Sequence, residues 1–160
     1  MHTFVPLRNA TIDMSTLTDD IAQLLPTTMR SVVRLMAVEL DSHGSELRLP
    51  QFGVLDFMLT NSRAVQTDLA NHFAKDKSVM LRQIDEMEQA GWIERQMDPD
   101  DRRRKILVVT RSGQEIHRKA SKLRSKVFAQ VLGGIGEKDL AVFLKVLRTM
   151  DETANSGDVK

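Results

Sequence analysis

The sequence predicts a mainly helical fold that contains one small β-hairpin. Apolar residues recur every three or four positions through most of the chain, which is the period of an amphipathic helix. The period changes once, at residues 92–95 and 105–109, which are short runs of residues typical of β-strands. The polar segment 97–104 lies between them and opens with turn residues, so it is the predicted hairpin tip.

The first predicted helix covers about residues 18–43. Thr18 is the expected N-cap, and two acidic residues follow it in the first turn. Pro26 either kinks this helix or marks its true start, and the pair His43-Gly44 is a plausible end. One continuous apolar stripe runs along the helix and consists of Ile21, Leu25, Met29, Val32, Met36 and Leu40.

Three shorter helices are expected next, at about 50–60, 66–73 and 78–90. Pro50 suits the first helical position, and Gly91 closes the third helix. In this third helix, Met80, Ile84 and Met87 share the predicted buried face. A helix-turn-helix followed by a β-hairpin is a winged-helix arrangement, and periodicity and turn chemistry alone predict it here.

Two further helices complete the chain, at about 111–132 and 137–153, and the glycine-rich segment 133–136 separates them. We therefore expect an N-terminal arm (1–16), a domain over 17–153 and a tail (154–160). Within the domain, the lobe with the helix-turn-helix and hairpin covers about 50–110. The flanking helices cover about 18–43 and 112–153.

The charge is unevenly distributed, although the 160-residue chain has a net charge of only +1. Residues 75–126 contain 14 basic and 9 acidic side chains, whereas both flanking segments are slightly acidic. Such a basic region can attract phosphate groups, or it can be an ordinary solvated surface. The chain contains no cysteine, which excludes disulfides, thiol redox sensing and zinc sites built from cysteine.

The third short helix offers a candidate DNA-binding face opposite its buried residues. Lys77 and Ser78 lie at its N-terminus, where free amides favour phosphate. Arg82 can donate two hydrogen bonds to guanine. Leu81 is an apolar residue on this polar face, and it either contacts a thymine methyl group or covers the wing. The face also includes Asp85.

The hairpin tip is the second candidate DNA contact. Its arginines, Arg102, Arg103 and Arg104, can enter a minor groove with strongly negative potential. Asp100 and Asp101 are expected to hold a neighbouring guanidinium in one rotamer, which lowers the entropy lost on binding. The alternative is a solvated hairpin with ion pairs of little energetic value.

These residues carry a family resemblance. The segment 98–113, DPDDRRRKILVVTRSG, resembles the wing signature of MarR-type transcriptional regulators, D-P-x-D-R-R followed by a strand and T-x-x-G. The helix before the wing is also similar to the family pattern, and the resemblance covers about residues 17–153. It implies a homodimeric winged-helix repressor or activator whose first and last helices interleave between subunits.

The resemblance also assigns roles to individual residues. It implies that Asp101 and Arg103 mark the wing contact, and that Arg82 is the arginine of the recognition helix. Leu81 departs from the family, which commonly has Thr or Ser at this position, so a hydroxyl contact to DNA is missing. Many of these regulators respond to small anions or phenols, which bind between the dimerisation helices and the DNA-binding lobe.

A dimer is also expected on physical grounds. The terminal helices carry more apolar surface than a monomer of this size can cover, and two-fold pairing would bury it. Two recognition helices about 34 Å apart would then favour a near-palindromic double-stranded DNA operator. The arm segment 4–7 either reaches across to the partner subunit or is frayed.

Other functions are less well supported. Four histidines without metal-ligand spacing argue against a metal-responsive regulator, and no enzyme motif or cofactor motif occurs. An architectural DNA-binding protein without an effector remains an alternative. Met29, Met36 and Met58 either line an adaptable ligand pocket or belong to the core. Neither a membrane span nor a targeting segment is predicted, so a cytoplasmic protein is expected.

Overall fold

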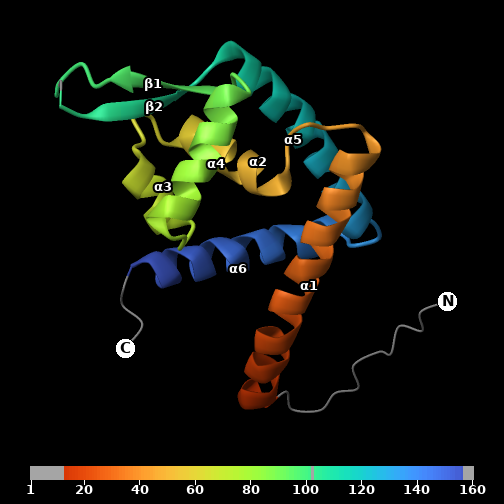
Figure 1. The fold of residues 1–160 in the computed structure, drawn as a ribbon. Helices are drawn as coiled ribbons and strands as arrows, with labels where there is room; N and C mark the ends of the chain where they lie inside the picture. The colour runs from red at the N-terminus through yellow and green to blue at the C-terminus, as the bar shows by residue number, and fades with distance from the viewer. Residues whose placement is uncertain (1–12, 102, 157–160) are drawn as a thin grey trace. The chain divides into compact units, whose positions relative to one another are not determined.

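The computed structural model describes residues 13–101 and 103–156, and it has the predicted mainly helical fold with one β-hairpin (Figure 1). The chain forms two compact units, and the division between them falls after Val127, inside α5. The elements are α1 (Met14–Ser42), α2 (Leu49–Thr60), α3 (Gln66–His72), α4 (Lys77–Gln89), β1 (Ile93–Met97), β2 (Lys105–Val109), α5 (Arg111–Val131) and α6 (Glu137–Asn155).

The first helix begins four residues earlier than the sequence predicts. Asp13 is its N-cap, because the Asp13 carboxylate accepts a hydrogen bond from the Ser15 amide at 3.1 Å. Thr18 lies inside the helix, and its hydroxyl donates to the Met14 carbonyl. The helix also runs through Pro26 and ends, as predicted, near Gly44, whose φ is 60°.

The first unit has a single hydrophobic core beneath the helix-turn-helix. The predicted buried face of α4 is confirmed, since Met80, Ile84 and Met87 are fully buried. They pack with apolar side chains from α2, α3 and the hairpin, and from one end of α1. The α1 stripe contributes only Val32, Met36 and Leu40 to the buried residues.

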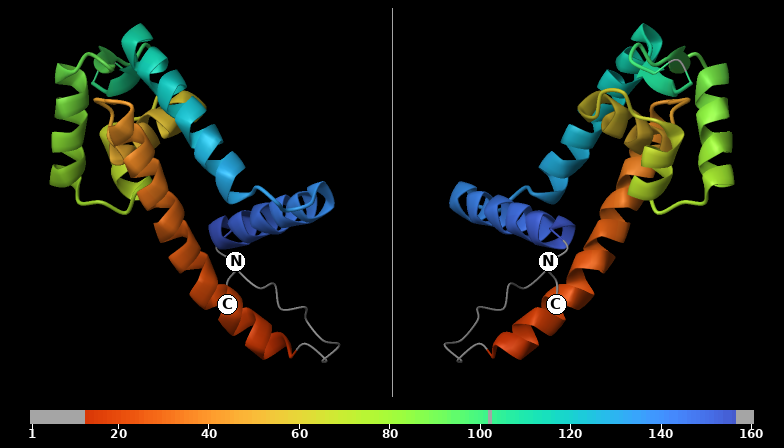
Figure 2. Two further views of the ribbon diagram at one scale, coloured as in Figure 1. Left: turned by 90° about the vertical axis from the view of Figure 1, so that its right-hand side faces the viewer. Right: turned by 90° about the vertical axis from the view of Figure 1, so that its left-hand side faces the viewer.

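The hairpin forms the wing beside this core. β1 and β2 pair antiparallel, with Ile93 opposite Val109 and Met97 opposite Lys105. Figure 2 shows α4 at the outer side of the first unit, away from α5. Helix α4 and the hairpin therefore have faces that no other described element of this unit covers.

Large apolar side chains remain exposed on α1 and on α6, each considered by itself. None of the α6 residues is buried, although Phe143 and Leu147 belong to a strongly apolar side of that helix. On α1, Ile21 and Leu24 are 47% and 64% exposed. Within the described residues, no helix has the length and apolar character that a membrane crossing requires.

Candidate nucleic-acid interface

The N-terminus of α4 already holds a carboxylate. Asp76 caps the helix by accepting hydrogen bonds from the Ser78 amide at 2.7 Å and the Ser78 hydroxyl at 2.6 Å. The bonds from the Ser78 hydroxyl and amide hold the Asp76 pKa below its usual value. Both donors of Ser78 are therefore occupied, and a DNA phosphate at this position would have to compete with Asp76.

The outward face of α4 presents three of the side chains expected from the sequence. Lys77 is exposed, and its positive charge acts on the neighbouring Asp76 carboxylate. The Arg82 side chain is 75% exposed, and its Nε lies 4.0 Å from Glu86, a distance at which an exposed pair restrains it weakly. Leu81 is 40% exposed, so it is available to a ligand.

An ion-pair cluster attaches the first strand of the wing to α4. Arg95 on β1 donates to Asp85 at 2.5 Å and also to Glu88. The Arg95 amide donates to Glu88 as well, at 3.3 Å. Asp85, which the sequence places on the outward face, thus has a structural partner. The cluster fixes α4 relative to the strand that leads to the wing tip.

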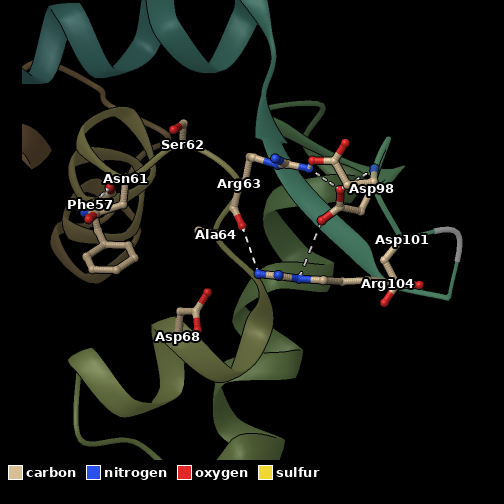
Figure 3. Close-up of a pocket in the computed structure, with 10 residues that line it drawn as sticks. Phe57, Asn61, Ser62, Arg63, Ala64, Asp68, Asp98, Asp101 and Arg104 are labelled. Atoms are coloured by element: carbon tan, nitrogen blue, oxygen red, sulfur yellow. Dashed lines mark hydrogen bonds and ion pairs between the residues drawn. The ribbon is translucent and has the colours of Figure 1, made fainter.

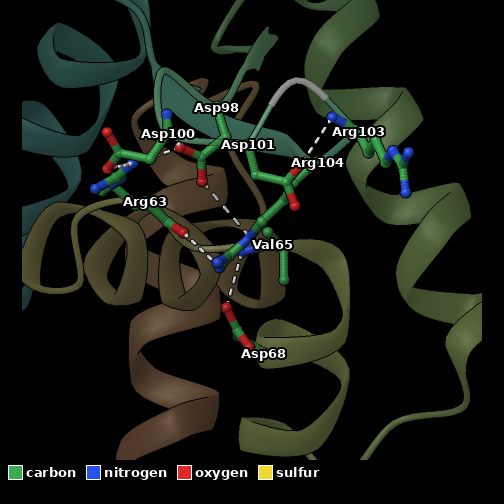
Figure 4. Close-up of polar contacts among 8 residues, drawn as sticks. All are labelled: Arg63, Val65, Asp68, Asp98, Asp100, Asp101, Arg103 and Arg104. Atoms are coloured by element: carbon green, nitrogen blue, oxygen red, sulfur yellow. Dashed lines mark hydrogen bonds and ion pairs between the residues drawn. The ribbon is translucent and has the colours of Figure 1, made fainter.

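At the wing tip, Asp101 accepts hydrogen bonds from two backbone amides of the turn. Its carboxylate accepts from the Arg103 amide at 2.9 Å, and its carbonyl accepts from the Arg104 amide at 2.9 Å (Figure 4). Figure 4 shows the Arg103 side chain directed away from the carboxylates at the wing root. Because Arg102, the arginine next to Asp101, lies outside the described residues, the pairing of Asp101 with a neighbouring guanidinium stays a prediction.

The arginines of the wing differ in their ion pairs and hydrogen bonds. The Arg103 guanidinium has no ion pair among the described residues. The Arg104 Nε lies 3.7 Å from Asp98, and its Nη2 lies 3.5 Å from the Arg63 carbonyl oxygen. Arg102 lies outside the described residues. Among the described wing arginines, Arg103 is the one free to contact DNA without breaking an ion pair.

Arg63, which no sequence pattern singles out, supplies the partner of the wing carboxylates. Arg63 lies in the turn between α2 and α3, and its Nη2 donates to Asp98 and, at 2.5 Å, to Asp100 (Figure 3). These residues surround a cavity of about 490 Å³ at the wing root. Asp100 does hold a guanidinium, as predicted, but that guanidinium comes from another element.

The second wing strand is joined to α5 by a tight turn. The Thr110 hydroxyl donates to the Gly91 carbonyl at 2.6 Å and accepts from the Gly113 amide at 3.0 Å. A Cβ atom at Gly113 would lie 2.0 Å from the Trp92 carbonyl oxygen, so only glycine fits. The T-x-x-G motif therefore fixes the position at which α5 leaves the wing.

A charged cluster connects α2 with α5. Asp56 accepts from His117 Nε2 at 2.8 Å and from Arg124 at 3.0 Å. His117 stacks on Phe52, and the Arg124 guanidinium lies 5.0 Å from the centre of the same ring. Partial burial alone would raise the Asp56 pKa, but the hydrogen bonds from His117 and Arg124 outweigh it and hold the pKa below its usual value.

Replacing Asp56 with Asn is expected to lower the free energy of unfolding by about 1 kcal/mol, because hydrogen bonds between charged groups are partly screened at this half-exposed site. Since the folded-state pKa is lowered, the contribution is fully present above about pH 4 and is lost progressively as the pH falls from there through the folded-state pKa. Urea unfolding at several pH values measures it, with Asp41→Asn as the exposed control. A wild-type advantage that persists at pH 2 would contradict this assignment.

The three methionines that the sequence offers as pocket-lining residues differ in their burial. Met36 and Met58 are buried in the core, as in the alternative interpretation, and Met29 is 47% exposed. A cavity of about 570 Å³ lies between the α1–α2 loop and α5, and its lining includes Ile116, Leu123, Lys119 and Lys122. No group of three or more metal-ligating side chains occurs within residues 13–101 and 103–156.

Comparisons with known proteins agree with this geometry. The model of the MarR family matches residues 47–105. The chain is 25% identical to the transcriptional regulator HosA from Escherichia coli O111:H- over 105 residues, 66% of this chain and 78% of that protein. It is also similar to the crystal structure of MarR, with 28% identity, a TM-score of 0.70 and coverage of 94% of this chain and 97% of that one.

Two structures of CouR show the same fold with different ligands. CouR from Rhodococcus jostii RHA1 bound to p-coumaroyl-CoA is 26% identical, with a TM-score of 0.68, and the match covers 84% of this chain and 93% of that one. The repressor CouR bound to a 23-mer DNA duplex is 22% identical, with a TM-score of 0.70, over 89% and 99% of the two chains.

Proposed function

Because the chain belongs to the MarR family of DNA-binding transcriptional regulators, we propose that it is a homodimeric repressor that binds a near-palindromic operator and is released by a small-molecule effector. Family members regulate transcription and are not enzymes. A regulator of transcription must meet the chromosome, so we place this protein in the cytoplasm.

One observation carries the proposal of sequence-specific binding. The recognition helix is anchored by buried side chains, while Lys77, Leu81 and Arg82 on its other face are exposed. In this arrangement Arg82 contacts a guanine in the major groove and Lys77 contacts phosphate. Leu81 meets a thymine methyl group. Ser78 contacts the backbone only where a phosphate displaces Asp76 from its hydroxyl.

The wing provides the flanking contact in this proposal. Arg103 enters the minor groove, and Arg102 belongs to the same basic segment. Arg104 stays near Asp98 and adds positive charge close to the phosphates. Asp101 contributes by shaping the turn that carries Arg103, rather than by touching DNA. These roles are assigned on the basis of the ion pairs: Arg104 is paired with Asp98, whereas Arg103 has no ion pair among the described residues.

We propose that α1 and α6 supply the dimer interface. Both helices expose apolar side chains that a soluble monomer would leave in water, including Leu24 and Phe143. Pairing of two copies about a two-fold axis would cover them and place the two recognition helices one turn of DNA apart. We also propose that the domain covers residues 17–153. In this domain the dimerisation helices, at about 18–43 and 112–153, are distinct from the DNA-binding lobe at about 50–110.

The cavity between the α1–α2 loop and α5 is the proposed effector site. Ile116 and Leu123 give it an apolar floor, while Lys119 and Lys122 supply positive charge. This combination fits an organic anion with an apolar body. CouR, a structural relative, binds p-coumaroyl-CoA, a molecule with both features.

The ratio of affinities for operator and unrelated DNA tests the proposal against its alternatives. A specific regulator should prefer its operator by a factor of about 10³ or more at physiological salt. An architectural protein would give a ratio close to one. A metal-responsive regulator would bind its operator only when the dialysed protein is supplied with a divalent metal.

Replacing Arg103 with Ala should weaken binding to every sequence by a similar factor, because the proposed contact is mainly electrostatic. The slope of log K against log salt concentration should become shallower by about one unit per wing. Fluorescence anisotropy at several salt concentrations measures the slope. Lys138→Ala on α6 is the control for the loss of one charge. An unchanged slope in Arg103→Ala would remove Arg103 from the interface.

A further inference from the structure

The wing root is tied to the turn between α2 and α3 over a long distance in sequence. Arg63 is separated from Asp98 by 35 residues and from Asp100 by 37 residues, yet one Nη2 atom donates to both carboxylates. The backbone φ of Arg63 is 68°, a value that residues other than glycine rarely adopt. The next residue, Ala64, accepts a hydrogen bond from the Leu107 amide of β2 at 2.9 Å.

Asp98 is the centre of this attachment. It is only 3% exposed, and its carboxylate accepts from Arg63, accepts from the Asp100 amide at 3.0 Å and lies 3.7 Å from Arg104. The Asp100 amide, followed by Arg63, lowers the Asp98 pKa despite burial. Asp100 and Asp98 raise the pKa of Arg63, so the Arg63–Asp98 pair stays charged at neutral pH.

The cluster divides the wing into a fixed root and an available tip. Arg104 faces the fixed root, and Figures 3 and 4 show it directed toward Arg63 and Asp98. Arg103 is directed away from that root. Ordering a flexible loop on binding costs conformational entropy and therefore lowers affinity. A wing whose root is already ordered avoids most of this loss when its tip binds DNA.

We propose that Arg63 is a positioning residue for DNA binding, which sets the wing against the helix-turn-helix so that Arg103 meets the minor groove beside the site. This proposal rests on the proposed DNA-binding function. Arg63 itself need not touch DNA, since its guanidinium is directed to Asp98 and Asp100. Its role is therefore separable from that of a phosphate-binding arginine.

The test is a hydroxyl-radical footprint of the full-length protein on its selected operator, together with the affinity. The variants are Arg63→Gln, Arg63→Lys and Asp100→Asn, which removes only the exposed partner of Arg63. The control is Arg118→Gln, because Arg118 also pairs with a carboxylate, that of Glu115, through an exposed guanidinium. It therefore removes the same charge and a comparable ion pair away from the wing.

Arg63→Gln should lose protection at the outer minor-groove positions and keep it over the recognition helix, with an affinity loss of about tenfold for two wings. Arg63→Lys should recover part of this loss, and Asp100→Asn should show a weaker form of it. The unfolding midpoint should stay close to that of Arg118→Gln. Hydrogen exchange at the Asp100 and Arg104 amides should accelerate in the free protein.

Two results would overturn the proposal. One is an Arg63→Gln footprint identical to that of Arg118→Gln. The other is a joint loss of inner and outer protection with a lower unfolding midpoint, which would show a general structural role. Failure of the proposed function gives a different result, because then even the wild-type protein protects no DNA sequence.

Discussion

Replacing Phe143 with Asp is expected to convert the dimer into monomers and to lower operator affinity by at least about 100-fold. Phe143 is 46% exposed on α6, beside Leu147 and Met150, in a helix that has no buried residue in the described structure. If this side is the interface, each dimer would bury two new carboxylates in apolar surroundings. Such burial costs several kcal/mol unless a partner compensates it.

Sedimentation velocity and DNA binding measure the two consequences of Phe143→Asp independently. The control is Lys145→Gln, which makes the same change in net charge on the polar side of the same helix. This control should remain dimeric and bind DNA like the wild-type protein. A Phe143→Asp protein that stays dimeric at micromolar concentration would exclude this face of α6 from the interface.

Replacing Arg82 with Ala is expected to abolish discrimination at one base pair of each half-site. The loss should be about 1–3 kcal/mol per half-site, because a guanine would lose two hydrogen bonds from one guanidinium. The Arg82 side chain is 75% exposed and only loosely paired with Glu86, so its removal should leave the fold intact. This predicts a specific change in base preference without a change in stability.

Competition between operators that differ at single positions measures this preference. Arg82→Ala should bind variants of one position equally well and retain wild-type discrimination elsewhere. Arg103→Ala should instead retain the full base preference while binding more weakly. An Arg82→Ala protein with the wild-type preference at every position would place the recognition contact on another residue.

The spacing of apolar residues predicts a helix and its buried face well where one face of that helix packs against the core. The α4 period identified Met80, Ile84 and Met87, and all three are fully buried. The predicted start of α1 at Thr18 is wrong, because Thr18 and Asp13 both have side chains that can cap a helix. In the structure the Asp13 carboxylate is the cap, and it accepts a hydrogen bond from the Ser15 amide. Choosing between two nearby caps requires the backbone geometry.

The wing shows why the site could not be derived fully from local sequence. Asp100 and Asp101 precede a run of arginines, so the sequence favours pairing between neighbours. In the structure Asp101 accepts from backbone amides, and Asp100 pairs with Arg63 from a distant turn. A positive φ at a residue other than glycine carries no clear sequence signal, and so the role of Arg63 was not predictable.

Selection of bound duplexes from random DNA tests the central claim most directly, because it measures binding, sequence preference and symmetry together. The wild-type protein should enrich an inverted repeat whose half-sites are centred about 10 base pairs apart. The Arg82→Ala protein should enrich the same repeat with one position in each half-site relaxed. Recovery of no common sequence, or of a single asymmetric half-site, would contradict a homodimeric operator-binding regulator.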